Sequence, residues 1–222
     1  INLSHTSKDQ LKSKIKFLKK LKVRNICIDT EGAQIRTTKI KKKVYLKSGT
    51  KLKIFIGNKN SSKRVVYLYP EFNLLSSKVG GKISIGFDDL VMKIVKVDKL
   101  KSHILVEVIN PGLLDSNKGV HFDNHISLNS LTKKDLDCIK IAVKNKINFF
   151  ALSFANKGDD VSNLRKLIPY KSFIVSKIET KNAIKNLSRI CAESDALLID
   201  RGDLSRYVDL SRIPYAQHYI VK

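Results

Sequence analysis

Two charged side chains stand two positions apart at the end of an apolar run, in "FIVSKIET" (residues 173–180). The run is typical of a buried strand, and residues i and i+2 of a strand point to the same face. Lys177 and Glu179 therefore project together, away from Ile178. A solvated strand end with a weak ion pair is one interpretation. A binding site that needs both a cation and a carboxylate is the other.

Polar residues also end four further apolar runs, and the five ends read "NLSH", "CIDTEG", "LSFANK", "VSKIET" and "LIDRGD". In α/β barrels the chemistry sits at the carboxyl ends of the strands. We therefore expect one rim to carry Asn2, Ser4, Asp29, Thr30, Ser153, Lys177, Glu179, Asp200 and Asp203. Carboxylates from three strands suit Mg²⁺, which binds one or two carboxylates together with substrate phosphates. This convergence favours a site over a structural ion pair.

Alternating strands and helices would position these groups. From about residue 126, "SLTKKDLDCIKIAVKNK" predicts a helix with Thr132 as N-cap and Asp135 three residues later. Three strands follow, with helices over "GDDVSNLRKLI", "TKNAIKNLSRICAE" (capped by Thr180) and "IPYAQHYIVK". This order predicts a parallel sheet with helical cover, whose closed form is the (β/α)₈ barrel. Five strand ends are too few to close one, so we expect a partial barrel.

The middle of the chain has a different pattern. Between residues 38 and 125 the helical period disappears, and short strand-like runs are separated by turn signals such as "SGT", "VGGK" and "NPG". We expect a small antiparallel β-domain, a barrel or a sandwich, inserted into an α/β domain formed by 1–37 and 126–222.

Composition excludes several classes of function. The formal charge is +23, but only 8 of the 43 basic residues are arginine, and the lysines are scattered instead of interleaved with aromatic residues. A nucleic-acid groove is therefore not expected, and no apolar run is long enough to span a membrane. Three isolated cysteines indicate neither zinc nor a disulfide framework.

The motifs "NLSH", "IDTEGAQIRT", "FDDLVMKI", "NPGLLDSNKGV", "LTKKDLDCIKIAV", "ALSFANKGDDV", "SKIE" and "RGDL" resemble those of pyruvate kinase, in the same order and across essentially the whole chain. The resemblance implies a (β/α)₈ TIM barrel interrupted by a mobile β-domain that covers the nucleotide. It also implies phosphoryl transfer between phosphoenolpyruvate and ADP, with Mg²⁺ and K⁺. We expect a homotetramer of the full-length protein in the cytoplasm, with a plastid-like organelle as the alternative compartment.

The resemblance also implies roles for individual residues. Glu179 and Asp203 would bind Mg²⁺, and Lys177 would face the transferring phosphoryl group. Gly202 and Asp203 would direct backbone N–H groups at the substrate carboxylate. Two larger sets complete the expected site: a K⁺ site of Asn2, Ser4, Asp29 and Thr30, and nucleotide contacts from Asn2, His5, Arg36, Lys118 and Asp89.

Several positions depart from the family pattern. "TEGAQIRT" carries Glu31 in place of lysine and Gln34 in place of the usual charged residue, which leaves the identity of the monovalent cation open. Asn156 replaces an arginine and Ser205 a glycine. The first strand, the last two barrel strands and the C-terminal domain of the family are missing from the motif order, so the sequence resembles a chain truncated at both ends.

Two alternatives therefore stay open beside the kinase. One is a catalytically inactive, kinase-like binding or scaffold protein. The other is a Mg²⁺-dependent, pyruvate-forming lyase or decarboxylase, in which the β-domain would have no nucleotide to cover.

Overall fold

The computed structural model describes residues 1–86, 90–124 and 126–222. The chain divides into two compact units. The first, called the α/β unit, contains Ile1–Ala33 and Asn129–Lys222, and the second, called the β unit, contains Gln34–Leu128. Residues 34–37 fall in the β unit because Ile35–Thr37 forms its strand β2.

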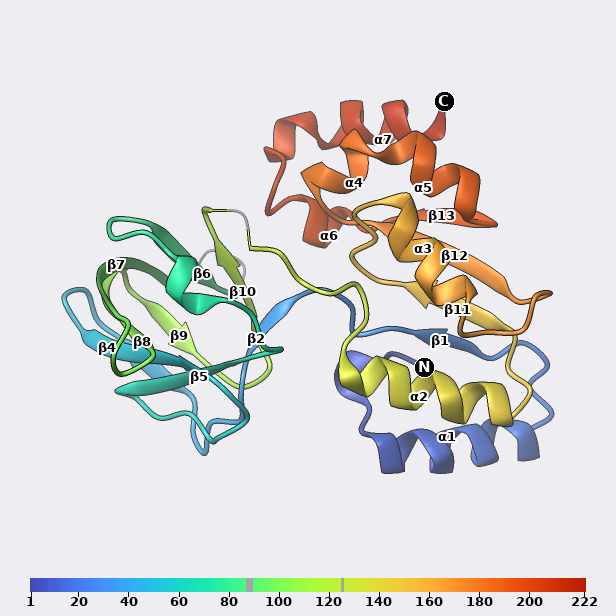
Figure 1. Cartoon of the computed structure of the whole chain (residues 1–222), viewed down its shortest axis with the longest axis horizontal. Coiled ribbons are helices and arrows are strands. Elements are labelled where there is room, and N and C mark those ends of the chain that lie inside the picture. The colour runs from blue at the N-terminus through green and yellow to red at the C-terminus, as the bar shows by residue number, and fades with distance from the viewer. Residues whose placement is uncertain (87–89, 125) are drawn as a thin grey trace. The chain divides into compact units, whose positions relative to one another are not determined.

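The α/β unit is built on a four-stranded parallel sheet in the order β1-β11-β12-β13 (Figure 1). These strands are β1 (Cys27–Asp29), β11 (Phe149–Leu152), β12 (Phe173–Ile178) and β13 (Ala196–Ile199). Next to β1, Asn2 forms a single parallel bridge with Asp29. The five predicted strand ends thus become four strands and one bridge. Over the described residues the sheet is open, so a closed (β/α)₈ barrel is not formed within this chain.

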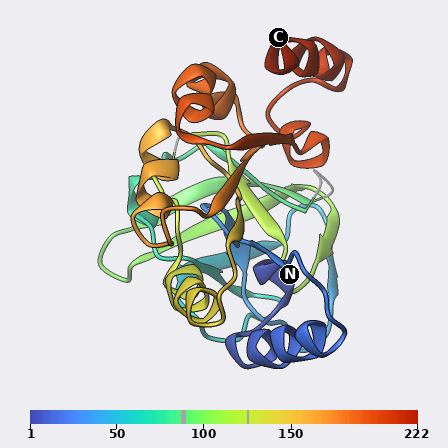
Figure 2. The ribbon, with the colours of Figure 1, turned by 90° about the vertical axis from the view of Figure 1, so that its right-hand side faces the viewer.

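Helices connect and cover these strands. Their bounds are α1 (Lys8–Lys20), α2 (Lys133–Lys144), α3 (Gly158–Arg165), α4 (Lys181–Lys185), α5 (Leu187–Glu193), α6 (Arg201–Leu204) and α7 (Ile213–Val221), with 3-10 turns η1 (Leu3–His5) and η3 (Leu210–Arg212). Within this unit, α1 and α2 lie side by side near β1, and α7 packs on the 3-10 turn η3 that precedes it (Figures 1 and 2). None of the described helices is long and apolar enough to cross a membrane.

Local capping explains where the helices begin. The predicted cap of α2 is confirmed: Thr132 accepts the N–H of Asp135, whose carboxylate accepts the N–H of Thr132. The single helix predicted after Thr180 is wrong, because it breaks into α4 and α5 at Asn186. The Asn186 side chain donates to the backbone oxygen of Asn156, so this residue anchors the loop after β11.

Side-chain alternation divides the sheet into two faces. Ile28, Phe150, Leu152, Ile174 and Ile178 are fully buried in a core shared with the helices. The residues between them point to the opposite face. Lys177 points to this opposite face. Asp29 and Glu179, each one position after a core isoleucine, do the same, so the charged residues of the site lie away from the helix-packed core.

The β unit contains a closed barrel in the order β10-β2-β5-β4-β8-β7-β6 and a separate pair, β3-β9. Its strands are β2 (Ile35–Thr37), β3 (Val44–Leu46), β4 (Lys51–Ile56), β5 (Val65–Tyr69), β6 (Lys82–Ile85), β7 (Leu90–Asp98), β8 (His103–Asn110), β9 (Gly112–Leu114) and β10 (Gly119–Phe122), with a 3-10 turn η2 (Leu74–Ser76). An antiparallel barrel or sandwich was expected. The structure has the barrel, in which β4 and β5 run parallel while the other barrel pairs are antiparallel.

Candidate active site

The ammonium group of Lys177 lies among three carboxylates of the α/β unit. Its Nζ is 3.0 Å from Glu179 Oε1, 3.5 Å from Asp200 Oδ2 and 3.7 Å from Asp29 Oδ1. Burial lowers the pKa of Lys177, but Glu179, Asp29 and Asp200 together raise it above its ordinary value. Lys177 is therefore held as a permanent cation at the carboxyl edge of the sheet.

Strand register explains why these groups meet. Ile178 of β12 pairs with Ile199 of β13, so the residues that follow, Glu179 and Asp200, leave the sheet at the same level. On the other side Leu152 pairs with Ser176, which places Ser153 beside Lys177. The Ser153 hydroxyl donates to Asp29 Oδ1 at 2.9 Å and accepts from Lys177 Nζ at 3.3 Å. The ends of four adjacent strands of the sheet therefore contribute to one cluster.

Glu179 is the buried member of this cluster, with no exposed surface. Its Oε2 accepts the backbone N–H of Phe154, whose φ of 54° is unusual for a residue with a side chain. Burial raises the pKa of the Glu179 carboxyl to about 8, Lys177 and the Phe154 N–H lower it, and the Asp203 charge adds to the rise. A cation near the Glu179 carboxyl group therefore stabilises its ionised form against the cost of burial.

Three carboxylates of this edge could hold a metal ion together. Glu179, Asp200 and Asp203 each place one oxygen within 4.8 Å of the other two. Ligand oxygens around Mg²⁺ lie about 3 Å apart in adjacent positions and about 4 Å apart in opposite ones, for bonds of roughly 2.1 Å. Small side-chain rotations would close that gap, so these hard oxygen donors fit the divalent cation expected at Glu179 and Asp203.

Two details of that expectation need correction. Asp203 does not lie on a strand next to Glu179, because it belongs to the short helix α6, where its Oδ1 is 3.5 Å from Arg206 Nε. Its backbone N–H donates to Asp200 Oδ1 at 3.3 Å, so in this structure that group faces Asp200. Asp200 was expected on the rim but was given no role, and its place in the carboxylate group is a finding of the structure.

The four residues of the predicted K⁺ site lie in one neighbourhood. Asn2 Nδ2 donates to Asp29 Oδ2 at 3.2 Å, and Asn2 Oδ1 accepts the N–H of Ser4 at 2.8 Å. Thr30 is buried, and its hydroxyl accepts the N–H of Ser153 at 2.9 Å. The donor oxygens are thus close in the fold, and their binding of a cation stays a prediction.

The predicted nucleotide contacts come from both units. Asn2 and His5 belong to the α/β unit, where His5 ends η1 with an exposed side chain. Arg36 and Lys118 belong to the β unit, on or beside the paired strands β2 and β10. Arg36 Nη1 donates to the backbone oxygen of Asn117 at 3.2 Å. Asp89, like its neighbour Asp88, lies outside the described residues.

A buried aspartate fixes the loop that follows β1. Asp135 accepts the backbone N–H of Glu31 at 2.7 Å and that of Gly32 at 3.2 Å, in addition to its capping bonds with Thr132. A Cβ on Gly32 would lie 2.6 Å from the backbone oxygen of Ser153, and Gly32 has a φ of +73°. Only glycine fits there, which brings this loop against the residue beside Lys177.

Three of the substituted positions also have structural roles. Glu31 is buried, with Oε2 3.6 Å from Lys134 Nζ. Asn156 accepts a hydrogen bond from Thr180 and donates to the backbone oxygen of Phe154. Ser205 donates to the Gly202 oxygen at 2.7 Å and thereby closes α6. Each substitution is accommodated within the loops at this edge.

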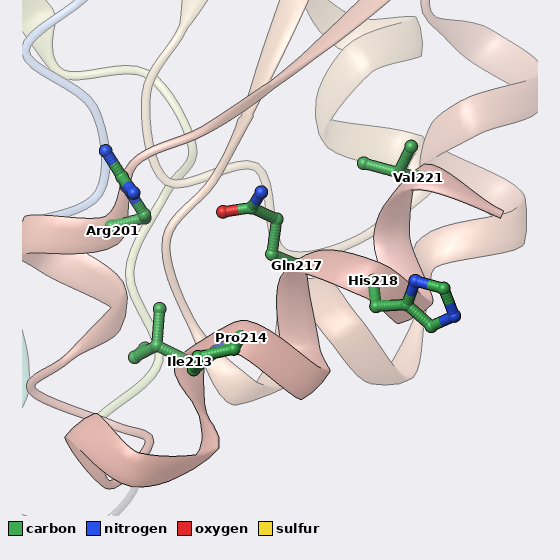
Figure 3. A pocket seen from close by; sticks show the side chains of 6 residues that line it. All are labelled: Arg201, Ile213, Pro214, Gln217, His218 and Val221. Carbon is green, nitrogen blue, oxygen red and sulfur yellow. The ribbon is translucent and has the colours of Figure 1, made fainter.

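A separate pocket of about 440 Å³ lies beside α7. Arg201 follows Asp200 in the chain, and the other lining residues, Ile213, Pro214, Gln217, His218 and Val221, come from α7. In Figure 3 the side chains of Arg201, Ile213 and Gln217 extend in the same direction. None of its six lining residues was predicted to belong to a site.

A parallel sheet with charged groups at its carboxyl edge defines an α/β protein with its site in the place usual for that class. The family model described as "Pyruvate kinase, barrel domain" matches residues 1–222. This chain therefore belongs to the pyruvate kinase family.

Individual relatives agree with this assignment. The pyruvate kinase of Dictyostelium discoideum is 33% identical over 235 residues, which cover 100% of this chain and 46% of the relative. Those of Staphylococcus saprophyticus and Staphylococcus aureus are 28% and 25% identical, over 100% of this chain and 40% of each relative. The chain spans less than half the length of these curated relatives.

Proposed function

We propose that this chain supplies the phosphoenolpyruvate- and metal-binding part of a pyruvate kinase, which transfers a phosphoryl group from phosphoenolpyruvate to ADP. The observation that carries the proposal is the position of Lys177, whose ammonium lies among Glu179, Asp29 and Asp200 at the carboxyl edge of the sheet. Membership of the pyruvate kinase family supports the same reaction.

The residues divide the work between charge and position. Lys177 faces the phosphoryl group and stabilises the charge on its equatorial oxygens as the group moves. Ser153 and Asp29 hold the lysine from one side while Glu179 holds it from the other. The backbone N–H groups of Gly202 and Asp203, in the first turn of α6, would bind the carboxylate of the substrate, which would replace Asp200 as the acceptor of the Asp203 N–H.

Glu179 and Asp203 would hold Mg²⁺, which when bound supplies positive charge to the phosphate and enolate oxygens. Asn2, Ser4, Asp29 and Thr30 would provide the oxygen donors for K⁺. Asn2, His5, Arg36, Lys118 and Asp89 are the residues that would contact the nucleotide, as the family resemblance implies. The active protein is a homotetramer.

A coupled assay with phosphoenolpyruvate, ADP, Mg²⁺ and K⁺ tests the proposal on the purified protein. Pyruvate formation that is lost in Lys177→Met would support it. Phosphoenolpyruvate binding by calorimetry without product would instead indicate the inactive binding protein. Consumption of oxaloacetate without nucleotide would indicate the lyase or decarboxylase.

A further inference from the structure

We infer that Asp200 is a third carboxylate ligand of the divalent-cation site, beside Glu179 and Asp203. The inference rests on the proposed function for the identity of the site. It adds a third ligand to the two that the family resemblance implies. The first evidence is proximity, because one oxygen of each of the three carboxylates lies within 4.8 Å of the other two.

The backbone fixes this proximity. Asp200 directly follows β13, and the pairing of Ile178 with Ile199 places it level with Glu179. Three residues later, the first turn of α6 brings Asp203 back beside Asp200. A loop of this kind presents two carboxylates to the buried Glu179 without any movement of the sheet.

Helix capping does not fully occupy the Asp200 carboxylate. As N-cap of α6, its Oδ1 accepts the Asp203 N–H at 3.3 Å, which is long for an N–H···O bond. Its Oδ2 lies 3.5 Å from Lys177 Nζ, and the side chain remains 31% exposed. Both interactions are loose, so the carboxylate can turn toward a cation at little cost.

Charge balance points to the same ligand. The ammonium of Lys177 faces Asp29, Glu179 and Asp200, and Glu179 is completely buried. One ammonium cannot neutralise the two carboxylates of Asp29 and Asp200, whatever the charge on Glu179, and unbalanced charge is costly in a partly desolvated site. A divalent cation with oxygen preference would balance the group, as Mg²⁺ or Mn²⁺ does. With three carboxylates, the site should bind such an ion before any substrate arrives.

Mn²⁺ binding to the purified protein, without phosphoenolpyruvate or nucleotide, tests this inference. Titration followed by the electron paramagnetic resonance of free Mn²⁺ gives the affinity. Asp200→Asn keeps a residue that caps helices well but removes the charge. We expect it to weaken Mn²⁺ binding about tenfold or more. Replacing a residue that only hydrogen-bonds to a metal ligand already costs roughly that much. Asp200→Ser, a second capping residue, should lose the same amount.

The matched control is Asp209→Asn, which removes the same charge from an exposed position before η3. It should leave the Mn²⁺ affinity unchanged. Unchanged affinity in Asp200→Asn and Asp200→Ser would overturn the inference. Equal losses in Asp200→Asn and Asp209→Asn would also overturn it, because the effect would then be one of net charge.

Direct ligation can be separated from an effect through Lys177. In protein labelled with ¹³C at its aspartate carboxylates, electron–nuclear double resonance of bound Mn²⁺ should detect more aspartate coupling in the wild type than in Asp200→Asn. Identical spectra would refute ligation by Asp200. The proposed function fails separately: a wild type that binds Mn²⁺ through Asp200 but forms no pyruvate would remove the kinase and leave this assignment standing.

Discussion

Glu179 and Lys177, two residues apart at the end of β12, point to the same face and form an ion pair with 3.0 Å between Glu179 Oε1 and Lys177 Nζ. Glu179 is the fully buried partner of this pair. The pair therefore is not a solvent-exposed surface ion pair at a strand end. Two further carboxylates, Asp29 and Asp200, approach the same ammonium. The site combines a fixed cation with an excess of negative charge, and the first two predictions follow from that combination.

Removing a metal ligand and removing the lysine should have different effects. We expect Asp203→Asn to weaken activation by Mg²⁺ and to lower kcat by about two orders of magnitude or more, because charge preorganised for the transition state is lost. Glu179→Gln should behave alike, and the double variant should be little worse, since the two residues act as one unit.

Lys177→Met should retain Mg²⁺ binding and lose phosphoryl transfer. Steady-state kinetics over a range of Mg²⁺ concentrations test this, and an unchanged Mg²⁺ dependence in Asp203→Asn would contradict it.

Binding of Mg²⁺ should release a proton at neutral pH. Burial, opposed by Lys177, raises the pKa of Glu179 from an ordinary 4.5 to about 8, whereas a metal ligand must be deprotonated. We expect release of up to one proton at pH 7 and almost none above about pH 9. Calorimetric titrations in two buffers with different heats of ionisation measure this number. Glu179→Gln should abolish the release, and buffer-independent heats in the wild type would contradict the prediction.

The same raised pKa has a consequence for stability without metal. As the pH rises, the unfolded chain loses the Glu179 proton near pH 4.5, whereas the folded protein keeps it up to about pH 8. This contribution to stability is present below about pH 4.5 and is lost as the pH rises through about 8. Bound Mg²⁺ should offset the loss, so its effect on the melting temperature should grow over that interval.

The elements of the α/β unit could be predicted because their signals are local. Period-2 alternation placed Lys177 and Glu179 on one face, and the Thr132 cap marked the start of α2. The break at Asn186 was missed, since it depends on a bond to Asn156 across a loop.

The cluster at the sheet edge could be predicted only in part. Its members follow from the strand ends, but the alignment of Glu179 with Asp200 depends on the register between β12 and β13, which spacing along the chain does not encode. The short α6 is below the length at which helical periodicity shows, so Asp203 was expected on a strand. The contact of Asp135 with Glu31 joins residues 104 positions apart and leaves no local pattern.

Asp135 should be the most sensitive carboxylate of α2. It is fully buried and accepts bonds from the backbones of Glu31, Gly32 and Thr132. Asp135→Asn turns an amide toward these donors and should cost about 2–4 kcal/mol in the free energy of unfolding. Asp137→Asn, on the same helix but only partly buried and paired with Lys8, is the matched control and should change little. Chemical denaturation compares them, and equal losses would show that Asp135 does not anchor the loop.

The start of β12 is held by a second acidic residue. Asp195 Oδ2 accepts the Ile174 N–H at 2.7 Å and pairs with Arg165 Nη2 at 2.9 Å. The Arg165 guanidinium also donates to the backbone oxygens of Ser172 and Glu193, so one ion pair connects α3, α5 and two strand starts. Burial raises the pKa of Asp195, but the Ile174 N–H and Arg165 outweigh it and the pKa falls below its ordinary 3.8.

This lowered pKa predicts how the stability of the α/β unit depends on pH. A depressed carboxyl pKa stabilises the fold above the unfolded value near 3.8, and the contribution disappears as the pH falls through the folded value. Asp195→Asn should therefore melt at a lower temperature than the wild type at pH 7, and the difference should shrink steadily below about pH 4. Asp209→Asn, at an exposed site, should match the wild type across the range. Melting temperatures measured by circular dichroism between pH 2 and pH 7 decide the matter, and a difference that stays constant with pH would show that Asp195 acts by shape instead of charge.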